Sequence, residues 1–198
     1  MKGIRIATAL AVFALVATAV DAQDKPLRVR GTITAIDGNV LSVKTREGQD
    51  LKLNLPADVG VAVAKAISFA DIKQGDYVGA TTMKQADGTL VAREVHYLPP
   101  QAKPGYIPWD LEPGSGMTNA NVEATVAAAG KRELTLKFPE GMQKIVVPDG
   151  VPLVRFVPGS RADLRVGEYI WTGATVAPDG KISAARISVS KDGVKPPH

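Results

Sequence analysis

Hydrophobic and polar residues alternate along short stretches of the chain, which is the period of a half-buried β-strand. The inward positions of these stretches are Val29, Gly31, Ile33 and Ala35, then Leu41 and Val43, then Leu51, Leu53 and Leu55, and in the second half Val122, Ala124 and Val126, then Leu134, Leu136 and Phe138, then Ile145 and Val147, then Ile182 and Ala184. Acidic-Gly pairs separate the runs, as in tight hairpins, at Asp37-Gly38, Glu47-Gly48 and Asp87-Gly88. The pattern predicts an all-β fold.

The chain also repeats itself. Residues 71–78 recur in character as residues 163–170, an offset of 92. Upstream the offset is 93, which matches Val29 to Val122 and Ile33 to Val126, so that one residue is lost in the second copy between Gly48 and Asp71. A fixed order of matches predicts two homologous domains, residues 26–98 and 119–191.

Five or six short strands in each unit are too few for a stable open sheet, so we expect each unit to close into a small barrel. Ser68 lies three residues before Asp71, and Ser160 three residues before Asp163. This spacing predicts a capped helical turn, with the following Ile72 or Leu164 plugging the barrel end. A catalytic pair of Asp71 and Asp163 is not expected, because the two carboxylates fall in separate predicted domains.

The first unit resembles a family of exported bacterial domains of unknown function that form small OB-like barrels. The motifs that carry the resemblance are residues 31–39, 41–43, 71–78 and 87–90. The second unit is similar more loosely, because Ala128-Ala129-Gly130-Lys131 replaces the first Asp-Gly hairpin. The resemblance implies two tandem OB-like β-barrels and an exported location, and it brings no catalytic residues.

The first 22 residues read as a cleavable signal peptide. Lys2 and Arg5 precede an apolar run of 15 residues, and small residues end at Ala22. That run is shorter than the roughly 20 residues of a membrane-spanning helix. We therefore expect a mature chain that begins at Gln23, has no transmembrane segment and is periplasmic, or extracellular.

Composition narrows the chemistry further. The 198 residues are 45% hydrophobic and contain no Cys, which excludes a disordered chain, a disulfide scaffold and a thiol nucleophile. There are 24 basic and 20 acidic residues, but they are interspersed, so nucleic acid is not an expected partner.

Residues 99–118 contain five prolines, yet they also carry Tyr106, Trp109 and Leu111. A free tether would leave these apolar side chains in water, so we interpret the segment as an ordered linker, a strap packed against one or both barrels and anchored by Trp109. The alternative is that Tyr106, Trp109 and Asp110 form the rim of a ligand or partner groove at the domain junction.

Barrels of this kind often bind polymers through aromatic side chains on one face. Tyr77 and Tyr169 share one repeat position, which predicts a common structural role. Trp171 has Gly79 as its counterpart, so we assign Trp171 to an inter-domain or ligand contact. Residues 192–198 are predicted to be a flexible tail.

Catalytic, cofactor and metal residues are not predicted. His96 and His198 are isolated imidazoles, and Ser115 lies between two glycines without the pattern of a nucleophile elbow. The sequence therefore favours a non-enzymatic binding or structural module of the periplasm, acting on an unknown protein or envelope ligand. A periplasmic accessory for metal handling, using His96, is the alternative, and an enzyme acting on envelope polymers is the third.

Overall fold

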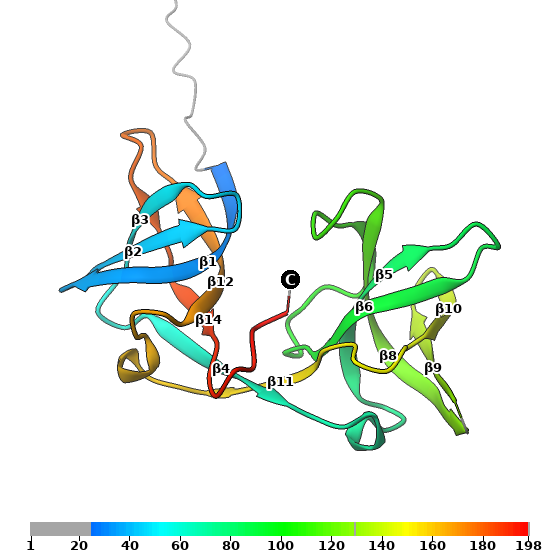
Figure 1. Cartoon of the computed structure of the whole chain (residues 1–198). Helices are drawn as coiled ribbons and strands as arrows, with labels where there is room; N and C mark the ends of the chain where they lie inside the picture. Colours follow the sequence, from blue (N-terminus) through cyan, green and yellow to red (C-terminus); the bar gives the residue numbers. More distant parts are fainter. Residues whose placement is uncertain (1–24, 129, 198) are drawn as a thin grey trace, which may run out of the picture.

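The structure is a computed structural model that describes residues 25–128 and 130–197 (Figure 1). The predicted signal peptide and His198 lie outside these residues. The described part is all-β, with two short 3-10 turns, and none of its helices could cross a membrane. The elements are β1 (Lys25–Asp37), β2 (Val40–Thr45), β3 (Asp50–Asn54), β4 (Gly60–Ala66), η1 (Phe69–Asp71), β5 (Tyr77–Lys84), β6 (Leu90–Tyr97), β7 (Gly105–Pro108), β8 (Ser115–Ala128), β9 (Lys131–Phe138), β10 (Gly141–Val146), β11 (Leu153–Pro158), η2 (Arg161–Asp163), β12 (Tyr169–Val176), β13 (Ile182–Ser183) and β14 (Arg186–Val189).

Five strands close into a barrel, here called the first barrel, in the order β1-β2-β3-β13-β12 and back to β1. All neighbours are antiparallel except β3 and β13, which run parallel, with Ile182 opposite Leu53. The predictions of an all-β fold and of a small closed barrel are confirmed.

A second ring, here called the second barrel, closes in the order β8-β9-β10-β6-β5 and back to β8. Its one parallel neighbour pair is β10 and β6, with Ile145 opposite Leu90. The second barrel therefore repeats the strand order of the first.

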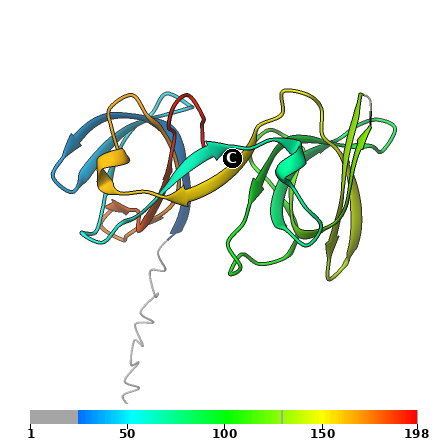
Figure 2. The ribbon, with the colours of Figure 1, turned by 90° about the horizontal axis from the view of Figure 1, so that it is seen from below.

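Each barrel takes strands from both halves of the chain, which corrects the predicted boundaries 26–98 and 119–191. The N-terminal strands β1 to β3 close with the C-terminal β12 and β13, whereas β5 and β6 close with β8 to β10. The cause is the pair β4 and β11, which runs antiparallel between the barrels and carries the chain from one to the other (Figures 1 and 2). Ala64 lies opposite Phe156 at the centre of this pair.

The strand register corrects part of the predicted repeat. A β-bulge follows Ile33 in β1 and Val122 in β8, so these two residues are equivalent, at an offset of 89 rather than 93. The hairpin between β8 and β9 is longer and extends past the barrel, which leaves Val126 43% exposed instead of inward-facing. The one-residue loss falls in the next hairpin, where residues 138–141 replace residues 45–49.

Each barrel has its own apolar core, and each predicted plug is in place. Leu164 is buried in the first core and Ile72 in the second. The preceding caps form as predicted, because Asp71 accepts the Ser68 N–H at 2.7 Å and Asp163 accepts the Ser160 N–H at 2.9 Å. These backbone hydrogen bonds lower the pKa of both carboxyls.

Candidate binding groove between the barrels

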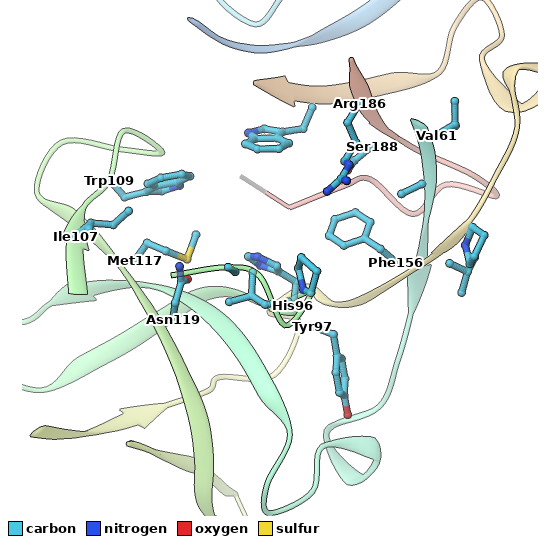
Figure 3. Close-up of a pocket in the computed structure, with 17 residues that line it drawn as sticks. Val61, His96, Tyr97, Ile107, Trp109, Met117, Asn119, Phe156, Arg186 and Ser188 are labelled. Atoms are coloured by element: carbon cyan, nitrogen blue, oxygen red, sulfur yellow. The ribbon is translucent and has the colours of Figure 1, made fainter. Parts of the chain in front are cut away.

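A cavity of about 660 Å³ lies between the two barrels (Figure 3). In Figure 3, Trp109 and Met117 from the strap and β8 face Phe156 and Arg186 from β11 and β14. We call this cavity the groove. Most of the residues that line it are apolar or aromatic: Val61, Ala62, His96, Tyr97, Leu98, Pro99, Ala102, Ile107, Trp109, Met117, Asn119, Phe156, Val157, Pro158, Trp171, Arg186 and Ser188.

The strap that carries Trp109 is fixed to the second barrel by hydrogen bonds. Strand β7 pairs with β8, and the Tyr77 hydroxyl donates to the Ala102 carbonyl at 2.8 Å. The backbone N–H of Trp109 donates to the Ser115 carbonyl at 2.8 Å, and the Ser115 hydroxyl donates to the backbone carbonyl of Trp109 at 3.0 Å. Residues 115–118, assigned to the linker from sequence, belong to β8.

Three arginines hold the same strap against the first barrel. The Arg28 guanidinium lies 4.2 Å from the centre of the Trp109 ring. Buried Arg30 donates two hydrogen bonds to Asp110, at 2.7 and 3.2 Å, and Arg46 donates to the Asp110 carbonyl at 2.9 Å. The Arg30 hydrogen bonds lower the pKa of Asp110 to about 2. The strap therefore contacts both barrels.

Of the four candidate contact residues predicted from the sequence, two line the groove and two do not. Trp109 and Trp171 both line the groove, although 62 positions separate them. Asp110 is not among the lining residues; it pairs with Arg30 and so holds the strap that carries Trp109. Tyr106 is half exposed and lines a separate hollow beside Glu140.

Two strand pairs in equivalent positions, one from each barrel, form opposite walls of the groove. Of the residues described below, only Trp171 was predicted from the sequence to make such a contact. On the first barrel, Trp171 in β12 lies opposite Ser188 in β14. On the second, Gly79 in β5 lies opposite His96 in β6. A Cβ atom on Gly79 would come within 2.9 Å of the His96 ring, so the glycine makes room for the imidazole.

Phe156 and Arg186 were missed altogether. Phe156 lies in β11 and meets the His96 ring edge-on, with ring centres 6.1 Å apart. A single Phe or Arg in a short strand gives no signal in the sequence, because only the crossing of β4 and β11 brings these side chains to the groove.

Trp109, Trp171 and Arg186 bring hydrogen-bond donors to the groove, while the side chains of Asn119, His96 and Ser188 can both donate and accept. Trp and Arg side chains have donors and no acceptors. No Asp or Glu is found among the described residues that line the groove. The Tyr97 hydroxyl is used structurally, since it donates to Asp76 at 2.5 Å, and burial raises the pKa of Tyr97.

A metal site would need several His, Asp or Glu side chains close together. Across residues 25–128 and 130–197, no three His, Asp or Glu side chains come together as a metal site would require. His96 is 2% exposed and packs between Gly79 and Phe156.

The C-terminal segment differs from the flexible tail that the sequence predicts for residues 192–198. Residues 191–194 form a turn in which Lys191 and Val194 exchange backbone hydrogen bonds of 3.1 and 2.9 Å. The following Pro196 and Pro197 are buried. The described tail is therefore packed against the protein.

Comparison with known proteins adds no further guide to the site. No family model matches the chain, and no curated protein or solved structure shows significant similarity to it.

Proposed function

We propose that this chain is an exported, non-enzymatic binding module of the periplasm that holds its ligand in the groove between the barrels. One observation carries the proposal. Trp109 and Trp171, the two tryptophans of the chain, come from distant segments and line the same cavity. Indole rings at a mostly apolar junction with a few polar groups are typical of ligand sites.

The size and surroundings of the groove support this proposal. A volume of about 660 Å³ is within the range of small-ligand pockets. The strap is held by Arg28, Arg30 and Arg46 on one side and by β8 on the other, so Trp109 is fixed before a ligand arrives. A pre-formed site loses less conformational entropy on binding.

The module's ancestry and location are part of the proposal. We interpret the two barrels as OB-like copies from a duplication, as in the family that the first unit resembles, with their strands exchanged through β4 and β11. The matched bulges after Ile33 and Val122 and the matched caps at Ser68 and Ser160 support this history. For export, mass spectrometry of the secreted protein is expected to find Gln23 as the first residue; a retained Met1 would contradict it.

Metal handling is the weaker alternative, because it would depend on His96, which is buried against Gly79 and Phe156. Calorimetric titration of the mature chain and of its His96→Ala variant with zinc or copper separates metal handling from the proposed function. We expect the variant to bind these metals no more weakly than the unchanged chain; metal binding that is lost in the variant would support metal handling. Action on envelope polymers would need a nucleophile or an acid–base pair at the groove, and its described lining contains no carboxylate.

The groove is tested with anilinonaphthalene sulfonate, an apolar anion whose fluorescence rises in apolar sites. The mature chain is expected to bind it, and because both tryptophans line the groove, energy transfer from them reports binding there directly. Trp171→Ala should weaken binding about tenfold or more, the loss expected when a central aromatic anchor is removed.

Tyr106→Ala is the matched control, since it removes an exposed ring outside the groove. Equal loss in both variants, or binding without energy transfer from tryptophan, would place the probe elsewhere and contradict the proposal.

A further inference from the structure

The chain's own C-terminal segment lies at the groove. After β14 the turn at residues 191–194, with Asp192 and Gly193 both at positive φ, sends the chain back toward the centre of the molecule. Both whole-molecule views place this end between the barrels, and Figure 3 shows its pale red ribbon among the groove side chains. Pro196 and Pro197, in this segment, are buried.

Proline suits this place for a physical reason. A buried backbone N–H without an acceptor costs free energy, and proline has no N–H. A Pro-Pro pair is also held in extended polyproline geometry before it docks, so it loses little conformational entropy. Burial of Pro196 and Pro197 therefore adds apolar contact and buries no backbone N–H of these two residues.

The groove offers what such a segment lacks. Trp109, Trp171 and Arg186 bear donors only, and the carbonyl oxygens of a proline segment are acceptors only. The flat rings of Trp109, Trp171 and Phe156 match the flat faces of proline rings, as in other aromatic grooves that bind extended proline segments. The preceding Lys195 is exposed, with its ammonium 5.2 Å from the centre of the Tyr169 ring.

We infer that the ligand class of the groove is an extended, proline-containing peptide segment, and that residues 195–197 of this chain are a built-in competitor for it. This inference rests on the proposed function, because it names the ligand of the same groove. A partner's segment binds when it displaces the chain's own tail. A tether this short gives the tail an effective concentration on the order of millimolar, so weak tail binding is enough to compete.

The experiment compares the mature full chain with a chain that ends at Val194, which keeps the turn at residues 191–194. The probe is a fluorescently labelled five-residue peptide with the sequence of residues 194–198, and its control carries Ala in place of both prolines. We expect the shortened chain to bind the proline peptide at least about tenfold more tightly than the full chain, since the competitor is gone. The alanine peptide should bind at least about tenfold more weakly than the proline peptide.

A matched point variant avoids truncation. Pro196→Ala with Pro197→Ala in the full chain is expected to raise affinity for the proline peptide in the same direction as the truncation. In the shortened chain, Trp171→Ala should abolish binding, while Tyr106→Ala should not.

The outcomes separate the two proposals. If the shortened chain binds anilinonaphthalene sulfonate but neither peptide, or binds both peptides equally, the groove remains a binding site and the peptide inference is overturned. If it binds neither the dye nor a peptide, both proposals fall. A full-length dimer that becomes monomeric on truncation would show that the tail occupies a second copy, which overturns the role of a competitor in cis.

Discussion

The two walls of the groove stand at equivalent places in the two barrels, but their residues are reversed. On the first barrel the large ring, Trp171, is on β12 and the small Ser188 is on β14. On the second barrel the small Gly79 is on β5 and the ring of His96 is on β6. Each wall therefore presents one ring, but from opposite strands.

This reversal has a packing reason and a functional consequence. Two large side chains do not fit directly opposite each other here, since even a Cβ on Gly79 would come within 2.9 Å of His96. Reversing the order keeps each wall filled and makes the groove asymmetric. If the groove binds the peptide that we propose, this asymmetry would favour one direction of the peptide chain.

The largest expected effect tests whether the barrels are independent bodies. Ile72→Ala and Leu164→Ala each empty the end of one barrel and should each lower the free energy of unfolding by about 3 kcal/mol. Because β4 and β11 join the barrels, we expect one transition in urea, seen alike by circular dichroism and by tryptophan fluorescence. Two transitions, with each variant moving only one of them, would show that the barrels unfold separately.

A second pair of variants compares equivalent backbone positions. Gly31 and Ala120 lie opposite Ile170 and Val78 at matching points of the two rings. A Cβ on Gly31 would meet the Lys44 carbonyl oxygen at only 2.3 Å, so Gly31→Ala should cost about 2 kcal/mol of unfolding free energy.

The reverse change, Ala120→Gly, should cost only about 1 kcal/mol, mainly through backbone entropy. Both costs are measured by urea unfolding. Equal costs would mean that the first barrel accommodates a Cβ atom at Gly31 without the steric penalty expected from the Lys44 carbonyl.

The reversed walls themselves are tested by Gly79→Ala. Displacing the His96 ring should cost about 1 kcal/mol, and adding His96→Ala should remove part of this penalty, so that the two changes are not additive. Ser188→Ala on the other wall should change the unfolding free energy by no more than about 0.5 kcal/mol. Additive costs in the double variant would show that the Gly79 and His96 positions are not coupled.

The smallest expected effect concerns the strap. The folded-state pKa of Asp110, about 2, lies below its ordinary value of 3.8, so folding favours the ionised form. The Arg30 pair therefore stabilises the fold above about pH 4, and this contribution is lost as the pH falls toward 2.

Since the Asp110 side chain is 46% exposed, solvent screening limits the effect to about 1 kcal/mol or less. Asp110→Asn should remove this part of the acid dependence, measured by thermal unfolding between pH 2 and 5. An unchanged acid profile would mean that other carboxyls dominate.

Local features of this protein were fixed by residues close together in the sequence. The alternation at Leu41 and Val43 specified a strand face, and Ser68 with Asp71 specified a capped turn, because strand faces and caps depend on side chains a few positions apart. Trp109 could be assigned to a packed strap from its apolar ring in a polar, proline-rich segment. These features required no knowledge of the partner strands.

Partner choice was decided only by the tertiary structure. Strands β5 and β12 are similar in sequence, and hydrophobic alternation does not show which of them pairs with β1 and which with β8. The crossing of β4 and β11 decides the exchange, because it delivers each half-chain to the opposite barrel. The same crossing brings Phe156 and Arg186 to Trp109, so the groove is a product of long-range pairing that no local pattern in the sequence records.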